Sequence, residues 1–296
     1  MQSDTFFVEK NRRILNTIDR MPNNTLLGNA YNASIYLSNR EELFIFGYIL
    51  QALEEKTDER YRSDIDNLMS AIHLLLLSGY HTYNLPMYYN RDRDAITERE
   101  TLHKYCNESL AELIIIILSR NGIKRLMKCN VPNSSNLLKI VRLFAEYGNE
   151  QRKLLCEDIS VYIGSTDENK QQTRNRLLNN TVKRDMYRIF KLCFVGFETI
   201  RSNRYPDGEL LEDIEVLSKN FSDLYVYTYT DILPSCNTVM ECSEREELFV
   251  SSKNRVMDKL LKRNYFNRSF GNILQFIERA FLCKIRDNMR LKSVKL

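Results

Sequence analysis

Hydrophobic residues recur every three or four positions through much of the chain, which is the spacing of an amphipathic helix. The clearest case surrounds the polar segment EEKTDER, with Leu43, Phe46, Leu50 and Leu53 before it and Ile65, Leu68, Ile72 and Leu75 after it. We therefore predict two antiparallel helices joined by a polar turn.

Three further segments have the pattern of a helix. Apolar residues from Val8 to Arg20 predict one helix near the N-terminus. The segment SSNLLKIVRLFAEYGN offers Ser134 or Ser135 as an N-cap and Gly148 as a stop. In RDMYRIFKLCFVGFETIRSN, aromatic residues share one helical face: Tyr187, Phe190, Phe194 and Phe197.

Two segments fit both a strand and a helix. LAELIIIIL, residues 110–118, is apolar on every side and fits a fully buried helix or a central strand, although the nearby Arg120 favours the helix. Residues 225–230 alternate as a half-buried strand would, but a helix between Pro206 and Pro234 explains a longer pattern. We therefore predict a helix in both places.

The composition supports helices throughout. Five prolines and nine glycines in 296 residues are few for a fold built from many short strands and tight turns. With 43% hydrophobic residues, the chain can bury a substantial core. We predict an all-α fold with short connections, in which the polar stretch from Ser165 to Thr181 forms a loop.

Charge, cysteine content and the length of apolar runs bear on the expected partners and cellular compartment of the protein. Lys and Arg number 43 against 39 Asp and Glu, and the resulting charge of +4 is too small by itself to indicate nucleic acid. The seven cysteines form no CxxC pair, which suits free thiols in a reducing compartment. No apolar run reaches the roughly 18 to 20 residues of a membrane span, and the N-terminus has no signal-peptide pattern. We expect a cytoplasmic protein without membrane association.

Several segments, in collinear order, resemble the 14-3-3 family. VLSKNFSDLYVYTYTDIL is similar to the family's helix L-x-L-A-L-N-F-S-V-F-Y-Y-E-I-L, with Asn220, Phe221 and Ser222 as the shared N-F-S. REELFIFGYILQALEEKTDERY resembles the family's first helix, LLLLSGYHTYN its L-L-S-V-A-Y-K-N, and SFGNILQFIERAF part of its last helix. The resemblance runs from about residue 40 to residue 285.

This resemblance implies a fold and a function. The fold would be about nine antiparallel helices that form a cup-shaped protomer, dimerised through its N-terminal helices. The function would be that of a non-enzymatic signalling adaptor, which acts by protein–protein interaction and binds phosphoserine or phosphothreonine peptides in a concave groove. The chain would then comprise an N-terminal extension, residues 1–39, a 14-3-3-like domain, residues 40–286, and a C-terminal tail, residues 287–296.

The resemblance also implies a phosphate pocket, which is incomplete in this chain. The family binds phosphate with a Lys, two Arg and a Tyr. Asn84 replaces the Lys, and Arg91 matches the first Arg. In the preferred register Val161 replaces the second Arg while Tyr162 matches the Tyr; in the alternative register Arg142 matches the second Arg. The predicted pocket is therefore atypical and partly lost.

Two further residues complete the predicted groove. Asn220 matches an Asn with which the family binds the peptide backbone. Ile277, in the last predicted helix, would form the apolar wall opposite.

Other chemistry finds little support in the sequence. His103 and Cys106 form a lone HxxC pair without further zinc ligands, and neither a glycine-rich phosphate loop nor a nucleophile elbow occurs. We therefore expect no enzyme activity, cofactor or metal. The alternative is a helical nucleic-acid-binding protein that uses the basic and aromatic stretches KRLMK and MDKLLKRNYFNRS and the C-terminal stretch KIRDNMRLKSVKL, although nucleic acid is the less favoured partner.

Overall fold

The computed structural model of this protein is built from helices. It describes residues 2–37, 41–85, 100–147, 167–229 and 239–293. Within these ranges every regular element is an α-helix or a short 3-10 helix, and there is no β-strand. The predicted all-α class is confirmed.

The chain divides into two compact units. Unit 1 comprises Met1–Val141 with Gly196–Arg204, and unit 2 comprises Arg142–Val195 with Tyr205–Leu296. Both α7 (Ser134–Glu146) and α9 (Asp167–Ser202) contribute residues to each unit. The division into an extension, a domain and a tail stays a prediction.

Unit 1 contains the helices of the N-terminal half. In chain order they are α1 (Gln2–Asn16), α2 (Leu26–Leu37), η1 (Glu41–Phe44), α3 (Ile45–Glu54), η2 (Glu59–Tyr61), α4 (Arg62–Asn84), α5 (Leu102–Cys106) and α6 (Glu108–Leu126). The two helices predicted around EEKTDER are α3 and α4, and the helix predicted near the N-terminus is α1.

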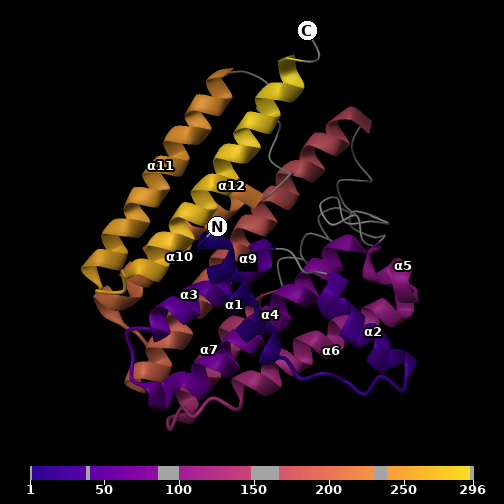
Figure 1. Ribbon diagram of the computed structural model, residues 1–296, viewed down its shortest axis with the longest axis vertical. Helices are drawn as coiled ribbons and strands as arrows, with labels where there is room; N and C mark the ends of the chain where they lie inside the picture. The colour runs from indigo at the N-terminus through magenta and orange to yellow at the C-terminus, as the bar shows by residue number, and fades with distance from the viewer. Residues whose placement is uncertain (1, 38–40, 86–99, 148–166, 230–238, 294–296) are drawn as a thin grey trace. The chain divides into compact units, whose positions relative to one another are not determined.

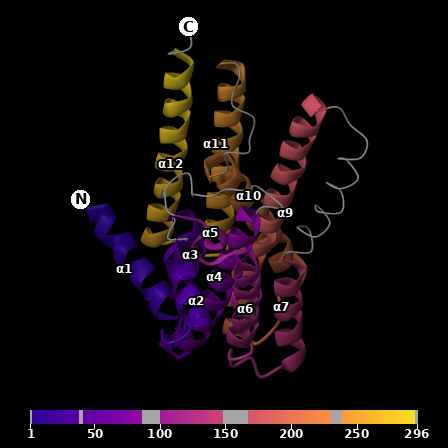
Figure 2. The ribbon, with the colours of Figure 1, turned by 90° about the vertical axis from the view of Figure 1, so that its right-hand side faces the viewer.

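Helix α4 packs against α3 and α6 in the core of unit 1 (Figures 1 and 2). Leu68 and Ile72 of α4, Phe46 of α3 and Leu118 of α6 are almost completely buried. Leu68 also lies against Gly196 of α9, where an added Cβ would come within 2.8 Å of the Leu68 Cδ2 atom. Residues at helical spacing in the sequence therefore fill this core, and a glycine permits the close approach of α9 to α4.

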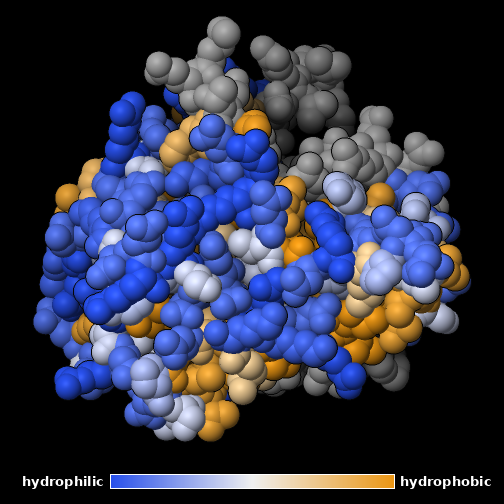
Figure 3. All heavy atoms as spheres, turned by 60° about the horizontal axis from the view of Figure 1, so that its bottom comes forward, coloured by the Kyte–Doolittle hydropathy of each residue, from blue (hydrophilic) through white to orange (hydrophobic). Residues whose placement is uncertain are grey.

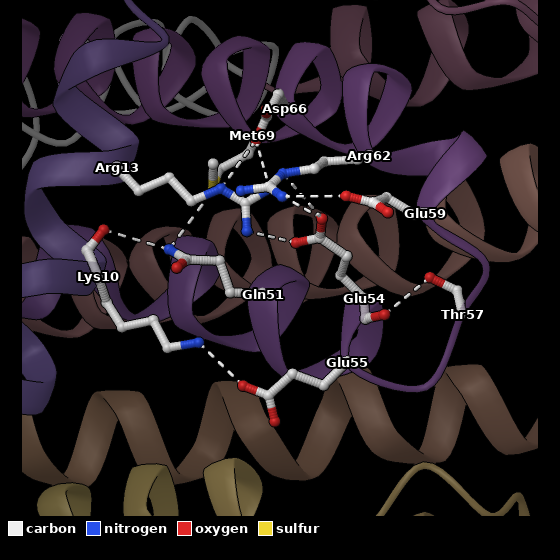
Figure 4. A network of polar contacts seen from close by, with 10 residues as sticks. All are labelled: Lys10, Arg13, Gln51, Glu54, Glu55, Thr57, Glu59, Arg62, Asp66 and Met69. Atoms are coloured by element: carbon white, nitrogen blue, oxygen red, sulfur yellow. Dashed lines mark hydrogen bonds and ion pairs between the residues drawn. The ribbon is translucent and has the colours of Figure 1, made fainter.

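A half-buried charge network ties α1 to α3 and α4 (Figure 4). Arg13 of α1 donates to both carboxylate oxygens of Glu54 on α3, at 2.5 and 2.9 Å, and to Asp66 on α4, at 2.7 and 3.1 Å. Burial lowers the pKa of Arg13, but the hydrogen bonds and charges of Glu54 and Asp66 outweigh it, so the pKa is raised. This forked arrangement holds α1 on the pair formed by α3 and α4.

Unit 2 contains most of α9 together with α10 (Gly208–Tyr229), α11 (Val239–Lys262) and α12 (Arg268–Ser293). Helices α11 and α12 run alongside each other (Figures 1 and 2), and Phe249 stacks on Phe281 with ring centroids 4.0 Å apart. Phe190 of α9 stacks on Phe221 of α10 at 5.2 Å. Aromatic pairs thus join successive helices of this unit.

Both ambiguous segments are helical, as predicted. Residues 110–118 belong to α6, and residues 225–229 form the end of α10. The α6 segment is not fully buried, because Leu113 is 45% and Ile116 is 51% exposed. The loop prediction for the polar stretch is wrong from Asp167 onward, where α9 begins.

The face shown in Figure 3 is mostly hydrophilic, with hydrophobic residues in scattered patches. Among the described residues, no helix combines the length with the low polarity that crossing a bilayer requires.

Candidate functional site

A pocket of about 720 Å³ lies between α9 and α10 in unit 2. Three cations, two carboxylates, two hydroxyl groups and one aliphatic side chain line it: Lys183, Arg184, Tyr187, Glu212, Glu215, Val216, Lys219 and Ser222. Ligand sites are concave and combine apolar walls with a few polar groups. We therefore take this pocket as the candidate functional site.

Helical spacing brings these side chains to one side of each helix. On α10 they recur at intervals of one, three and four residues, at positions 212, 215, 216, 219 and 222. The opposite side of α10 is fully buried at Leu217, Phe221 and Leu224. On α9, Lys183 and Tyr187 are four residues apart. The amphipathic pattern of α10 thus directs a polar stripe toward the pocket.

The charges are distributed unevenly along the pocket. Near one end, the Ser222 hydroxyl donates to the Lys183 carbonyl at 2.7 Å. Near the other end, Lys191 of α9 donates to Glu215 at 2.7 Å. From Glu212 to Ser222 the helix rises by about 15 Å. The pocket therefore has a cationic end, which we define by Lys183, Arg184 and Lys219, and a carboxylate end.

The cationic end is open to solvent. Lys183 is ion-paired with Asp223, whose side chain is 11% exposed, but the Lys183 side chain itself remains 44% exposed. Arg184 and Lys219 are exposed, and Lys219 forms no ion pair with any residue in the described part of the chain. An anion that enters the pocket can therefore meet several cations.

The carboxylate end is partly neutralised by Lys191. Burial lowers the pKa of Lys191, but the hydrogen bond to Glu215, together with nearby charges, outweighs it, and the pKa is raised. The Lys191 ammonium also lies 5.8 Å from the centroid of the Tyr187 ring. Lys191 therefore stays charged at neutral pH and offsets Glu215.

A metal site is not formed by the side chains that the structure describes. They include no group of three or more His, Cys, Asp and Glu residues that could hold an ion. Of the HxxC pair on α5, Cys106 bonds to the Leu102 carbonyl at 3.1 Å and His103 contacts the Thr101 hydroxyl at 3.2 Å.

Two asparagines that the sequence placed in a groove bond to their own helices instead. The Asn84 amide, at the end of α4, donates to the Tyr80 carbonyl at 2.9 Å. The Asn220 amide, on α10, donates to the Val216 carbonyl at 2.7 Å. Both are buried and neither lines the pocket.

Ile277 and Arg142 are not brought to the pocket either. Ile277 of α12 is 2% exposed and belongs to the core. Arg142 is 83% exposed and pairs with Glu146 one turn later at 3.5 Å. Arg91 and Tyr162 fall outside the described residues. The structure does not test these residues as ligand contacts.

Sequence reasoning misses the three cations of the pocket. VKRDMYR contains Lys183 and Arg184, and LSKNFSDL contains Lys219. The available signal is that these cations stand on the polar side of otherwise apolar helices. Such cations are common on solvated helix faces, and only the pairing of α9 with α10 brings these together.

The basic residues of MDKLLKRNYFNRS, one stretch of the proposed nucleic-acid surface, form ion pairs within unit 2. Lys262 lies 3.0 Å and Arg263 2.6 Å from a carboxylate oxygen of Asp213, and Lys259 also pairs with this carboxylate. Tyr265 is 7% exposed. These residues hold α11 to α10, so this stretch of the nucleic-acid alternative makes contacts within unit 2.

Comparisons with known proteins identify the fold. The sequence matches no protein-family profile and no curated protein. A geranyltransferase from Legionella pneumophila aligns with a TM-score of 0.67 over 95% of this chain and 97% of its own, at 14% identity. A geranyltranstransferase from Thermotoga maritima aligns with a TM-score of 0.66 over 97% and 100%, at 14% identity. A Helicobacter pylori geranyltransferase, solved with magnesium and isoprenyl diphosphate, aligns with a TM-score of 0.60 over 97% and 98%, at 15% identity.

These structures overturn the resemblance to the 14-3-3 family. Amphipathic helices in unrelated folds share spacing and short apolar strings, so collinear matches of a few residues do not identify a family. The expectations that rested on it are therefore wrong: a non-enzymatic adaptor, phosphorylated protein partners, phosphopeptide binding and a 14-3-3-type homodimer. The matching structures bear the names of enzymes, and this chain has the all-helical fold of geranyltransferases and other isoprenoid synthases.

Proposed function

We propose that this protein is an enzyme that acts on isoprenyl diphosphates and transfers an isoprenyl group. The observation that carries the proposal is a pocket with a cationic end in a chain that shares its fold with geranyltransferases. One of these, from Helicobacter pylori, was solved in complex with isoprenyl diphosphate. Such a ligand joins an anionic head to an apolar tail, so it requires cations beside an apolar wall.

The pocket supplies both requirements. Lys183, Arg184 and Lys219 can donate charged hydrogen bonds to the diphosphate, each with a contribution of about 1.5 to 3 kcal/mol. The planar guanidinium of Arg184 can donate two parallel bonds to phosphate oxygens. Val216 and the ring of Tyr187 offer apolar surface between the two ends of the pocket.

The same cations suit the chemistry of transfer. When an isoprenyl group leaves its diphosphate, the carbon–oxygen bond breaks and its electron pair stays on the diphosphate oxygen. Cations fixed beside that oxygen stabilise the developing charge. We therefore assign Lys183, Arg184 and Lys219 to binding the diphosphate as the leaving group.

Magnesium accompanies the ligand in the Helicobacter pylori structure, but the described carboxylates of unit 2 do not fit this ion. Mg²⁺ is bound through carboxylate oxygens and water. Asp223 is paired with Lys183, Glu215 with Lys191, and Asp213 with three cations of α11 and its C-terminal end. The described residues contain no group of three or more His, Cys, Asp and Glu side chains that could hold an ion, so we assign no step to magnesium.

A product assay tests the proposal. The full chain is incubated with geranyl diphosphate and a five-carbon isoprenyl diphosphate, with and without magnesium, and products are resolved by mass spectrometry. We expect a longer isoprenyl diphosphate to form and Lys219→Gln to slow its formation, because Lys219 lines the pocket. Arg255→Gln is the matched control, since Arg255 is exposed on α11 away from the pocket. If none of the mixtures yields a longer product, the proposed activity is wrong.

We also propose that the protein works in the cytoplasm. The four cysteines whose side chains the structure describes are free thiols, which supports a reducing compartment: Cys106, Cys129, Cys193 and Cys283. Fractionation of cells that express the tagged chain tests this location.

A further inference from the structure

Three arginines form a straight line along α12 in unit 2. Arg268, Arg279 and Arg286 are exposed, and none of them forms an ion pair with a residue that the structure describes. They lie 11 and 7 positions apart, and at about 100° per residue both steps return to within about 20° of the same direction. With a rise of about 1.5 Å per residue, the line is about 27 Å long. We call these three residues the arginine line.

The arginine line faces away from the neighbouring helix α11. Phe281 marks the side of α12 that contacts α11, because its ring stacks on Phe249 of that helix (Figures 1 and 2 show the two helices side by side). Counted from Phe281, the three arginines lie about 140 to 160° around α12. Leu282, between Arg279 and Arg286 in the sequence, is 41% exposed and lies about 40 to 60° from the line. An anionic surface can therefore meet the cations and this leucine from one direction.

The carboxylates of the two helices leave the arginine line positively charged. In its described side chains α12 contains one carboxylate, Glu278, which accepts from Lys253 of α11 at 2.7 Å. On α11, helical spacing puts Glu247 and Asp258 on the flank turned away from α12, and the half-buried Glu246 beside the contact between the helices. These carboxylates therefore do not interrupt the arginine line.

We propose that unit 2 docks on an anionic lipid bilayer through the arginine line. Anionic leaflets attract Lys and Arg that lie close to the membrane surface, and guanidinium groups donate paired hydrogen bonds to phosphate oxygens. Leu282 then enters the interface between the head groups, where an aliphatic side chain is favourable. The C-terminal sequence after the line adds three cations and one acid: Arg290, Lys292, Lys295 and Asp287.

This contact lies on the membrane surface and does not cross the bilayer. The expectation of no membrane association rested on the lack of a spanning run, which does not bear on surface contact. The cytoplasmic leaflet is rich in anionic lipids, so it is the membrane surface of this kind that a protein in the cytoplasm meets.

A bilayer fits this surface better than a nucleic acid does. The exposed large hydrophobic side chains that the structure describes on α11 and α12 are all aliphatic: Leu248, Val250, Leu261 and Leu282. Val250 turns to the same side as Leu282, because each follows a stacked phenylalanine and the two helices are antiparallel. Proteins that bind single strands stack the bases on aromatic side chains. Aliphatic side chains beside cations instead suit a membrane interface.

Sedimentation with vesicles tests the proposal. The full chain is mixed with vesicles of phosphatidylcholine alone and with vesicles that contain about one-third phosphatidylserine. We expect it to sediment with the anionic vesicles and not with the neutral ones, and to be released at about 0.5 M salt, because salt screens exposed charges. Arg279→Gln and Arg286→Gln are each expected to lower the partition coefficient about fivefold, and the double variant about 25-fold.

Matched controls lie on the opposite side of the helix pair. Arg255 of α11 is exposed there, so Arg255→Gln is expected to bind the vesicles within about twofold of the unaltered chain. Leu282→Gln is expected to weaken binding about fivefold, because the exposed part of the leucine no longer enters the interface. Leu248 is 45% exposed on the opposite side, so Leu248→Gln is expected to have no effect. Circular dichroism verifies that each variant is folded.

Three outcomes overturn the proposal. The first is equal binding to neutral and anionic vesicles, and the second is an equal loss in Arg255→Gln and in the arginine-line variants. The third is no binding to vesicles together with binding to RNA that Arg279→Gln/Arg286→Gln loses and Leu282→Gln keeps, which assigns the line to nucleic acid.

The proposal does not rest on the proposed function. The arginine line lies outside the pocket, so the variants are expected to form the longer isoprenyl diphosphate at the unaltered rate when no vesicles are present. Failure to bind vesicles leaves the proposed activity in place, and failure to form product leaves the membrane contact in place.

Discussion

The ammonium group of Lys191 on α9 lies 2.7 Å from a carboxylate oxygen of Glu215 on α10. Lys191 is 17% exposed and Glu215 is 45% exposed, so the pair forms a boundary between the core and the pocket. Without Lys191, the Glu215 charge would act on the pocket unopposed. The ion pair therefore sets the electrostatic potential that an anionic ligand meets.

Replacing Lys191 is expected to weaken the binding of geranyl diphosphate. In Lys191→Met the Glu215 carboxylate repels the diphosphate. Interactions between charges near the surface are worth about 1 kcal/mol, which corresponds to a loss of affinity of about fivefold. Calorimetric titration measures the change.

The double variant Lys191→Met/Glu215→Gln is the control for that experiment. It removes both charges, so its affinity is expected to return to within about twofold of the unaltered chain. A double variant as weak as the single one would show that Lys191 acts on binding by another route.

Loss of Arg13 is expected to destabilise unit 1. Arg13→Ala leaves Glu54, whose side chain is 13% exposed, without its forked partner, and such a loss costs about 1.5 to 3 kcal/mol. Hydrogen exchange of the α1 and α3 amides reports the effect within the unit. The matched control is Arg60→Ala, because Arg60 is 69% exposed and its pair with Asp58 contributes at most about 1 kcal/mol. Equal effects of the two variants would contradict the structural role of the Arg13 network.

The helices could be predicted from the sequence because their spacing is a local property. Leu43, Phe46 and Leu50 recur at helical intervals, and each is buried against the helices of unit 1. The segment at residues 225–229 shows how length decides between two patterns, since a helix of 22 residues outweighs a short alternation. Local spacing does not specify which helices pair, and this is why the same pattern also matched an unrelated helical family.

The candidate site could not be predicted because it depends on that pairing. Lys183 and Lys219 are separated by 36 positions in the sequence, and only the packing of α9 on α10 brings them to one pocket. Asn220 attracted a functional interpretation because a polar residue in an apolar helix needs a bond partner. The partner is the Val216 carbonyl of its own helix, a contact that leaves no trace in the sequence pattern.

Two glycines in helices are expected to respond oppositely to alanine. At Gly28 in α2 a Cβ would collide with the Pro22 carbonyl oxygen and lie 3.0 Å from its carbon, so Gly28→Ala should destabilise by about 1 to 3 kcal/mol. At Gly271 in α12 the nearest atom would be 3.7 Å away, so Gly271→Ala should stabilise by about 0.4 to 1 kcal/mol. Thermal unfolding followed by circular dichroism measures both. A rise in melting temperature for Gly28→Ala would contradict the close approach of α2 to Pro22.

Acidification is expected to destabilise unit 1 through two buried histidines of α4. Burial lowers the pKa of both histidines to about 4. Hydrogen bonds with the backbone, of Leu43 for His73 and of Ser34 for His81, raise the pKa but do not offset the burial. The His81 Nε2 atom lies 2.9 Å from the Ser34 carbonyl oxygen, so this nitrogen carries the proton of the neutral ring.

The sign follows from proton uptake by the unfolded chain. Between pH 6.5 and about 4 the unfolded chain protonates these histidines and the folded chain does not, so the free energy of unfolding falls as the pH falls. For each histidine the full loss is about 3 kcal/mol, reached near pH 4. Urea unfolding at several pH values between 7 and about 4 measures it.

A variant without the titrating rings separates this effect from other acid-sensitive groups. His73→Gln/His81→Gln is expected to be less stable near neutral pH, because of altered packing, but to lose less stability between pH 6.5 and 4. Asp213 does not interfere in this range. Burial raises its pKa, but hydrogen bonds from Lys259, Lys262 and Arg263 outweigh it and lower the pKa to about 2. Its contribution is therefore present above about pH 3.8 and is lost only as the pH falls toward 2. An equally steep loss between pH 6.5 and 4 in the double variant would show that other groups control the acid response.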